Sequence, residues 1–460
     1  MYDTLTRRLA ELPASDGRLR MYVCGPTVYD YFHIGNARPF IVFDALRRYL
    51  ESRGLEVTYV QNITDVEDKV IARARREGKA PQEVAGRYAE AYFHDLESLG
   101  VQRPTYSPRA TEYVPQMVDL IRVLVEKGHA YEADGDVYFS VASFPDYGQL
   151  SGKVLEELEA GARIAVEDKK RDPLDFALWK AAKPGEPQWP SPWGQGRPGW
   201  HTECVVMARD LLGETVDVHA GGSDLIFPHH ENELAQAEAA TGRPLARMWL
   251  HNGMLTVRGE KMAKSTGNFA YARDVVAEFG GEAVRYFYLS RHWRKPLDFS
   301  TEAVGEAKRA VERIYGFLWE AETLPAEGEV PQAFSDELAS LGGRFHAELD
   351  DDFNTAGAIG VLQEVVGTAH RFRTGGGCPA GVRGAAALVR QLAAPLGLFQ
   401  APRRAAPGLA EQLVELLVDL RGRLRGERNF ALADHIRDRL AELGVELRDT
   451  PQGSTWVQRD

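Results

Sequence analysis

The sequence predicts an α/β protein with a doubly wound parallel sheet, followed by a helical bundle and a small C-terminal α+β domain. Three observations predict this class. A strand, a helix and a second strand alternate near the start, the alternation resumes after residue 200, and the pattern is helical beyond residue 300. The 460 residues, of which 44% are hydrophobic, suffice for two to four domains with a sizeable core.

The sheet begins with "LRMYVCG" at residues 19–25, which reads as a short buried strand. Residues 38–54 form an amphipathic pattern closed by a glycine, which predicts a helix, and "EVTYVQNITD" at 56–65 predicts the next strand. Strand, helix and strand within about 45 residues form a βαβ unit, the usual opening of a parallel sheet.

A less regular stretch follows. We expect a helix over 111–127 and a hairpin over 128–141 with its turn at Asp134 and Gly135. Residues 183–200 hold five prolines, four glycines and three tryptophans. This composition excludes regular helix or sheet and predicts an ordered loop, because three indoles are too much apolar surface to leave in water.

The remaining elements alternate again and then become helical. They are a strand over 215–225, a helix over 229–242, a strand over 247–257, helices over 302–322 and 335–372, a linker at 400–408, a helix over 431–444 and a hairpin over 445–458.

Composition, net charge and cysteine spacing limit the functions that the sequence can have. No window approaches about 18 uninterrupted apolar residues and no export signal is visible, so we expect a cytoplasmic protein without a membrane partner. The net charge of -12 does not exclude a nucleic acid, because a local basic face can still bind phosphates. Three widely separated cysteines favour metal binding or burial over a disulfide framework.

The motif "HIGN" at 33–36 stands at the start of the first helix of the βαβ unit. A helix N-terminus presents unpaired N–H groups to phosphates, Gly35 permits close backbone approach, and His33 can donate to a phosphate oxygen. The alternative is a histidine that merely caps a turn, and four residues alone do not decide between the two.

A second basic motif, "GEKMAKSTGN" at 259–268, carries Lys261 and Lys264 between glycines. Such a loop can close over a triphosphate and stabilise the charge that develops at the α-phosphorus. Taken alone, however, lysines in a loop are usually just solvated.

Together the two motifs resemble the paired signatures of class I aminoacyl-tRNA synthetases. The blocks "MYVCGPTVYD", "NITD", "RPGWHTEC", "GGSDLIFPHHENE" and "DTPQGSTW" are similar to the cysteinyl-tRNA synthetase family, over residues 21–456. Two positions depart from the family signatures: Asn36 replaces the usual histidine and Ala263 the usual serine. Asn36 keeps a hydrogen-bond donor, and neither change removes a group with an obvious proton-transfer role.

A metal site is possible from the residues themselves. Cys24 ends the first strand and Cys204 follows the Trp-rich loop, while Glu233 shares a helix face with His229 at i,i+4 or His230 at i,i+3. Two thiolates, an imidazole and a carboxylate suit tetrahedral zinc, although two buried structural cysteines are the alternative. The resemblance implies Cys24, Cys204, His229 and Glu233 as ligands of one Zn²⁺ per chain.

Zinc would account for the selection of cysteine. A thiol with a pKa of about 8.5 ionises readily on a metal, whereas a serine hydroxyl is a far weaker acid and a poorer ligand. We therefore expect no editing domain.

The resemblance also implies the remaining site residues. The catalytic groups are His33, Lys261 and Lys264. ATP, with Mg²⁺, would bind at His33, Gly35, Asn36, Asp224, Lys261, Lys264 and Ser265, and cysteine at Thr64, Trp200, His201 and His219. His219 and Asp224 correspond to family positions near the adenosine, while Trp200 could equally be core and Thr64 a turn cap. Cys378 lies outside every motif, and we expect no function for it.

The implied reaction uses L-cysteine, ATP and cysteine tRNA. Cysteine attacks the α-phosphate to give cysteinyl-adenylate and pyrophosphate, and the terminal ribose 2′-OH then attacks the adenylate. Six arginines against three acids over 421–439 suit RNA contacts, although such a surface helix is usually just solvated. We expect a monomer.

Two other functions fit part of the sequence. One is a ligase that joins cysteine to a small amine, as in mycothiol biosynthesis, but the block from "DHIRDRL" to "GSTW" favours the tRNA enzyme. The other is a non-catalytic, zinc-stabilised nucleic-acid-binding protein, against which the two phosphate motifs argue.

The resemblance divides the chain into five parts. They are the first half of a Rossmann-type catalytic domain at 1–112, a connective insertion at 113–200, the second half of the catalytic domain at 201–300, a helical bundle at 301–400 and an anticodon-binding domain at 401–460.

Overall fold

The computed structural model describes residues 1–153, 169–261, 269–402, 409–450 and 453–458. The chain forms two compact units, Met1–Gln400 and Ala401–Asp460. Among the described residues, no helix is both long and apolar enough to cross a membrane.

A parallel sheet of four strands, in the order β10-β9-β3-β4, organises the first unit. Its strands are β3 (Arg18–Val23), β4 (Glu56–Gln61), β9 (Val216–Gly222) and β10 (Ala246–Asn252). The predicted βαβ unit is confirmed, because α1 (Ile34–Ser52) joins β3 to its parallel neighbour β4. The second half is confirmed too, with α7 (Glu231–Thr241) joining β9 to β10.

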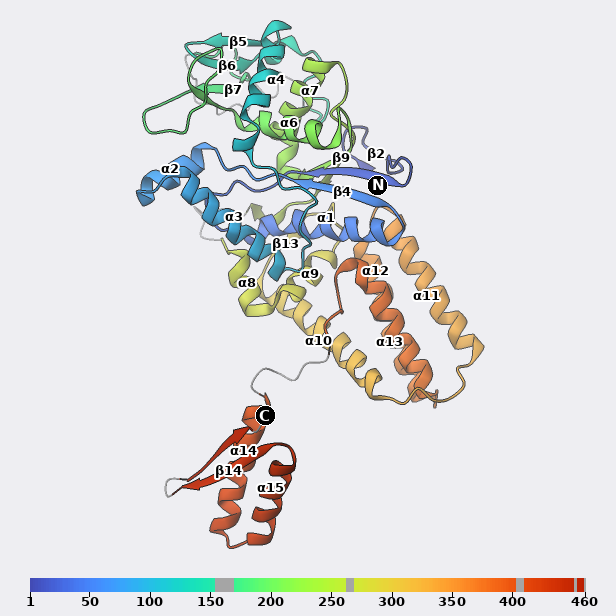
Figure 1. The fold of residues 1–460 in the computed structure, drawn as a ribbon. Helices are drawn as coiled ribbons and strands as arrows, with labels where there is room; N and C mark the ends of the chain where they lie inside the picture. Colours follow the sequence, from blue (N-terminus) through green and yellow to red (C-terminus); the bar gives the residue numbers. More distant parts are fainter. Residues whose placement is uncertain (154–168, 262–268, 403–408, 451–452, 459–460) are drawn as a thin grey trace. The chain divides into compact units, whose positions relative to one another are not determined.

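Helices cover both faces of this sheet (Figure 1). Met21 and Val23 of β3 belong to one hydrophobic core together with α1, whereas Tyr22 belongs to a second core together with α6 (Trp200–Leu212) and α7. Successive side chains of a strand point to opposite faces, so one strand supplies both cores. The sheet is therefore doubly wound, as predicted.

A smaller antiparallel sheet, in the order β5-β6-β7-β8, is formed by residues that lie between β4 and β9 in the chain. It contains β5 (Ala130–Ala133), β6 (Asp136–Phe139), β7 (Phe176–Ala181) and β8 (Gly196–Pro198). The predicted turn is confirmed, since Asp134 and Gly135 have φ of 51° and 81°. The prediction that 183–200 contains no strand is wrong, because β8 pairs with β7 as the edge strand, where Pro198 needs no N–H for a further neighbour.

The other elements of the first unit surround these sheets. They are β1 (Tyr2–Asp3), β2 (Arg8–Leu9), α2 (Asp68–Glu77), α3 (Pro81–Ser98), α4 (Val114–Glu126), β11 (Leu255–Val257), β12 (Glu260–Lys261), α8 (Ala272–Phe279), α9 (Gly281–Leu289) and β13 (Leu297–Asp298). Strands β12, β11 and β13 form a small sheet of their own, in that order.

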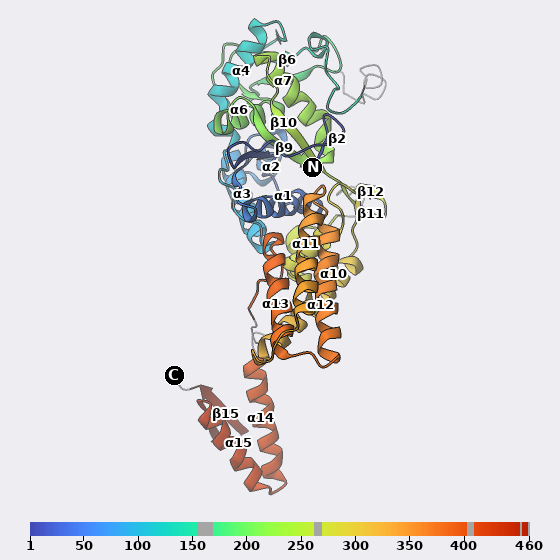
Figure 2. The same ribbon diagram turned by 90° about the vertical axis from the view of Figure 1, so that its right-hand side faces the viewer.

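The bundle consists of α10 (Thr301–Thr323), α11 (Gln332–Asp350), α12 (Thr355–Thr374) and α13 (Pro379–Ala393) (Figure 2). The single helix predicted over 335–372 is wrong. Asp352 and Phe353 both have φ of 52°, which ends α11, and Asn354 caps α12 with its side chain. Contacts distant in sequence hold this turn, because the carboxylate of Asp352 accepts from the Tyr2 N–H.

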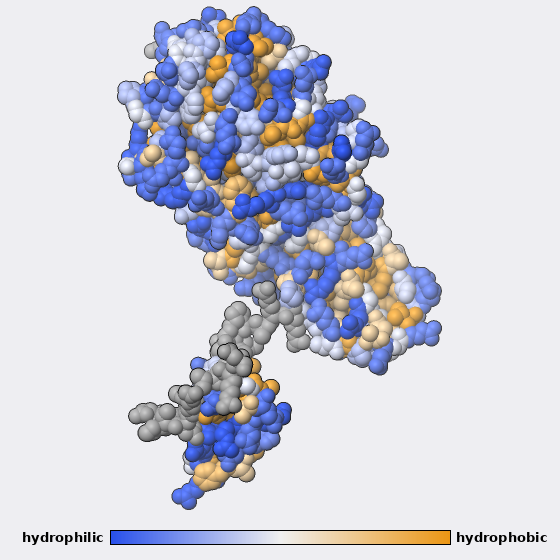
Figure 3. Space-filling model, viewed as in Figure 1, coloured by the Kyte–Doolittle hydropathy of each residue, from blue (hydrophilic) through white to orange (hydrophobic). Residues whose placement is uncertain are grey.

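The second unit contains α14 (Leu409–Gly426), α15 (Phe430–Glu442), β14 (Val445–Thr450) and β15 (Gly453–Gln458). The predicted helix and antiparallel hairpin are confirmed, whereas α14, which follows the Pro-rich stretch directly, was not predicted. Figure 3 shows hydrophobic surface on this unit, and Leu413, Leu416 and Leu443 are among its exposed side chains. A unit this small buries only part of its apolar surface.

Candidate active site

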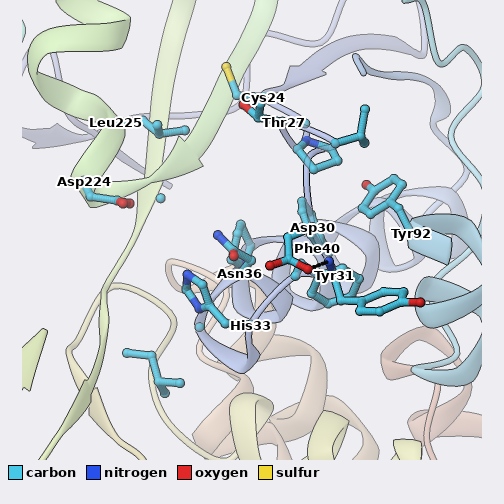
Figure 4. A pocket seen from close by; sticks show the side chains of 18 of the residues that line it. Cys24, Thr27, Asp30, Tyr31, His33, Asn36, Phe40, Tyr92, Asp224 and Leu225 are labelled. Atoms are coloured by element: carbon cyan, nitrogen blue, oxygen red, sulfur yellow. Dashed lines mark hydrogen bonds between the residues drawn. The ribbon is translucent and has the colours of Figure 1, made fainter. Parts of the chain in front are cut away.

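A pocket of about 350 Å³ lies at the carboxyl ends of the parallel strands, where ligands bind in open α/β sheets. Cys24 follows β3, Asp224 follows β9, and Gly253 follows β10. Figure 4 shows Cys24 and Asp224 on one side of the pocket, with His33 and Asn36 across from them. Cys24, His33, Trp200 and Asp224, which come from separate sequence motifs, therefore line one pocket.

His33 is the residue immediately before α1, with extended backbone at φ -82° and ψ 162°. Its neighbours fix it, because the Ile34 N–H donates to the Ala270 carbonyl at 2.9 Å and His33 pairs with Tyr271. Gly35 is needed here, since a Cβ at that position would lie 2.9 Å from the His33 ring. Asn36 is exposed at the pocket wall.

The second phosphate motif is described only at its start. Lys261 lies in β12, where its backbone pairs with Thr256 of β11. Ala263, Lys264 and Ser265 lie outside the described residues.

The predicted metal ligands meet beside the pocket. Cys24, Cys204, His229 and Glu233 are all buried, and their ligand atoms lie within 4.8 Å of one another. The two Sγ atoms are 3.9 Å apart. Tetrahedral zinc with Zn–S bonds of about 2.3 Å requires a sulfur–sulfur separation of about 3.8 Å. The donor set therefore fits zinc without rearrangement of the thiols.

A second group of ligand atoms overlaps the first: Cys24, His219, His230 and Glu233. His230 Nε2 lies 3.1 Å from Cys24 Sγ, and His219 Nε2 lies 2.9 Å from Glu233 Oε2. The choice between His229 and His230 that spacing left open thus persists in the geometry. The set with His229 contains both thiols, which borderline-soft zinc prefers.

The charges around Glu233 favour the ionised form of its carboxylate. Burial and the nearby Cys24 raise the pKa of Glu233, but His229 and His219 outweigh both and bring it to about 2. Glu233 Oε1 is 2.7 Å from His229 Nε2. The carboxylate is therefore ionised at neutral pH, as a metal ligand must be.

Two hydrogen-bonded residues that the sequence reading missed, His251 and Thr4, continue from this group through His230. His230 Nδ1 lies 2.7 Å from His251 Nε2, and His251 Nδ1 lies 2.8 Å from the Thr4 hydroxyl. These hydrogen bonds hold the imidazole rings in one orientation, which is what the hydrogen-bond partners of metal ligands commonly do. Only the "HNG" turn after a strand hinted at His251, and nothing marked Thr4.

Trp200 and His201 lie against the metal group. The Trp200 ring stacks on His229 with centroids 4.1 Å apart, and His201 Nδ1 is 2.9 Å from His229 Nδ1. Trp200 also lines the pocket and remains 38% exposed. It therefore forms part of the wall between the metal group and the pocket.

Thr64 and His219 lie behind the pocket surface. His219 is fully buried and stacks on Tyr22 beside the metal group, and it does not line the pocket, whereas Asp224 does. The Thr64 hydroxyl donates to Glu203 Oε1 at 2.6 Å. Burial raises the pKa of Glu203 to about 8, so this carboxyl holds a proton at neutral pH.

Two family models and a known relative match the chain. A family model described as the class I (C) tRNA synthetase catalytic domain matches residues 11–309, and a DALR domain model matches residues 344–400. A cysteine–tRNA ligase from Carboxydothermus hydrogenoformans is 48% identical over 466 aligned positions, which cover 99% of each chain. The chain belongs to the cysteine–tRNA ligase family.

Solved structures of other aminoacyl-tRNA synthetases share the fold of this chain. A methionyl-tRNA synthetase from Mycobacterium tuberculosis in complex with methionyl-adenylate superposes with a TM-score of 0.64 at 17% identity, covering 87% of this chain and 94% of that one. A ternary LeuRS–tRNA–LeuAMS complex from Agrobacterium radiobacter gives a TM-score of 0.61 at 14% identity, covering 84% of each chain. The predicted class I Rossmann-type fold is confirmed.

Proposed function

We propose that this ligase activates L-cysteine with ATP to cysteinyl-adenylate and transfers the cysteinyl group to the 3′ end of cysteine tRNA. One observation carries the residue-level proposal. Cys24 belongs both to the metal group and to the pocket that His33 lines, so an amino-acid thiol and ATP phosphates can occupy one space.

The amino-acid end is assigned to Cys24, Cys204, His229 and Glu233, which would hold one Zn²⁺ per chain. When bound, zinc ionises the substrate thiol far more readily than a serine hydroxyl, and so selects cysteine at the binding step. The binding of the cysteine substrate is assigned to Thr64, Trp200, His201 and His219. Trp200 and His201 contact His229, His219 contacts Glu233, and Thr64 donates to the neighbouring Glu203.

The ATP end is assigned to the opposite wall. The phosphates would be contacted by a hydrogen-bond donor, His33, and by two positive charges, Lys261 and Lys264. Mg²⁺ would accompany the nucleotide. Gly35, Asn36 and Ser265 complete the phosphate contacts, and the Asp224 carboxylate accepts from ribose hydroxyls. The substrate carboxylate attacks the α-phosphate, and no covalent enzyme intermediate is required.

The tRNA is assigned to the later parts of the chain. We propose catalytic halves at 1–112 and 201–300, a connective insertion at 113–200, a helical bundle at 301–400 and an anticodon-binding domain at 401–460. The protein would act as a cytoplasmic monomer.

A pyrophosphate-exchange assay followed by a tRNA-charging assay tests the proposed reaction. We expect cysteine-dependent exchange of pyrophosphate into ATP without tRNA, followed by acylation of cysteine tRNA. Exchange without any charging, together with coupling of cysteine to a small amine, would instead support the amine ligase. Absence of both activities in zinc-loaded protein would contradict catalysis altogether.

A truncation tests the C-terminal assignment. Removal of residues 401–460 deletes one compact unit and leaves the other whole. Exchange should survive at the full rate while tRNA charging falls, because only the second step needs the anticodon contacts. Equal loss of both steps would refute the assignment.

Serine discrimination tests the metal assignment. Cysteine should be preferred over serine in the exchange assay only while zinc is bound. Discrimination that persists after zinc removal would show that the protein pocket, and not the metal, makes the selection.

A further inference from the structure

A fully buried cation lies directly behind the pocket. Arg38 is in the second turn of α1 and is 0% exposed. Within the described residues, no carboxylate lies within ion-pair distance of it. Burial lowers the pKa of Arg38 only to about 10, so it remains charged at neutral pH. A buried charge without a counter-ion is costly unless hydrogen bonds replace its water.

The guanidinium donates to backbone carbonyls from two separate segments. One amino group, Nη1, donates to Gly253 at 2.7 Å and to Met254 at 2.9 Å. The other, Nη2, donates to Lys295 at 2.6 Å. The first segment leads into β11 and the second into β13, its parallel neighbour. Arg38 therefore ties α1 to the starts of both strands.

Two segments that line the pocket meet at Arg38. The α1 wall contains Gly35 and Asn36, and the β11 wall contains Gly253 and Met254. The backbones around Gly253 are already at closest approach, because a Cβ there would lie 2.4 Å from the Lys295 carbonyl oxygen. The Arg38 hydrogen bonds thus set the separation of the two walls without reaching into the pocket.

This separation bears on the ATP end. The wall of α1 begins at His33, and β11 pairs with β12, which ends at Lys261. A displacement of one wall therefore moves the Lys261 backbone relative to His33. Misplacement of reacting groups by about 1 Å can slow a reaction about 100-fold.

We propose that Arg38 is a positioning residue for adenylate formation, which holds the strand leading to Lys261 at a fixed distance from the helix that begins after His33. The proposal rests on the proposed function, since it concerns the ATP-dependent step. Arginine suits this task because its planar fork donates in several fixed directions, whereas a lysine ammonium is a compact point charge that cannot bridge both segments.

The test compares Arg38→Lys with the wild type in rapid-quench measurements of the adenylate burst, with the amplitude expressed per bound zinc. We expect an unchanged amplitude, a burst rate lower by about 10- to 100-fold, and an unchanged KM for cysteine. A role in stability alone would lower the amplitude and the Tm and leave the rate per active chain unchanged. That result would overturn the proposal.

Arg285→Lys is the matched control. Arg285 is also buried, at 1% exposure, and donates to the Leu396 and Gly100 carbonyls as well as to Asp44, none of which lines the pocket. The Arg285→Lys variant should have a lower Tm than the wild type and an unchanged burst rate. Equal slowing in both variants would contradict a specific role for Arg38.

A second variant decides the question if Arg38→Lys does not fold. Gly253→Ala leaves Arg38 in place but forces the Gly253 and Lys295 segments apart, because the added Cβ would lie 2.4 Å from the Lys295 carbonyl oxygen, so the guanidinium can no longer hold both carbonyls at their present spacing. A slow burst of full amplitude would support the proposal, and a wild-type rate would overturn it. A wild-type protein without any burst would instead refute the proposed function, so the two failures are distinguishable.

Discussion

The metal end and the phosphate end of the pocket differ in how their groups are held. Cys204, His229 and Glu233 are each at most 2% exposed, and their positions are fixed by contacts with one another. His33 is half-buried and Asn36 is exposed, and both are placed by backbone pairing at the start of a helix. One end is a closed cluster of side chains, whereas the other is an open wall.

This difference fits the roles proposed for the two ends. Selection of a thiol needs fixed donor atoms with little water, because discrimination depends on their geometry. The nucleotide has to enter and pyrophosphate has to leave, so its contacts must stay accessible. Variants at the two ends should therefore fail in separable ways.

The largest effect is expected from Cys204→Ala at the metal end. Zinc content should fall from one per chain to none, and adenylate formation should fall by more than about 1000-fold, because several kcal/mol of electrostatic stabilisation are lost with the metal. Metal analysis and the exchange assay measure both. Cys378→Ala is the control, since that thiol lies outside the metal group. Retention of zinc in Cys204→Ala would remove this residue from the site.

At the phosphate end, His33→Ala should lower kcat for adenylate formation by about 100- to 1000-fold, because a preorganised donor to the reacting phosphate is lost. Zinc content should stay unchanged. His94→Ala, whose side chain is 79% exposed, is the control and should behave as the wild type. If His33→Ala also loses zinc, the two ends are not independent.

A smaller effect is expected behind the metal ligands, from His230→Asn. If His229 is the ligand, zinc should still bind but about 10- to 100-fold more weakly, because a supporting partner of Cys24 is lost. Competition with a chelator measures this affinity. Complete loss of zinc would instead make His230 the ligand and select the second group of donor atoms.

The smallest effect is expected from Asn36→His, which restores the residue usual in the family signature. Asn36 is exposed and already offers a donor, so one hydrogen bond of about 0.5–1.5 kcal/mol is at stake, and KM for ATP should change by less than about tenfold. Steady-state kinetics with varied ATP measures it. A larger change would mean that charge at this position matters to the phosphates.

Local patterns accounted for most of the fold. The alternation of strands and helices predicted the doubly wound sheet, and the Asp134–Gly135 turn predicted the hairpin of β5 and β6 in the antiparallel sheet. The errors arose where tertiary contacts override local preference. Residues 335–372 are helical in pattern, but the turn at Asp352 is held by Tyr2, Trp293 and Arg294, far away in sequence.

The sequence by itself determined the chemistry of the site. Strands of a parallel sheet end at one edge, which placed Cys24 there, and helix spacing put Glu233 on one face with His229 or His230, while the family resemblance supplied the complete ligand set. Only the tertiary structure brought His230 and His251 behind Cys24, buried Glu203 against the Thr64 hydroxyl so that its pKa is raised, and set Arg38 between the α1 and β11 walls. These depend on which buried polar groups find partners, and such pairing joins residues that no local pattern connects.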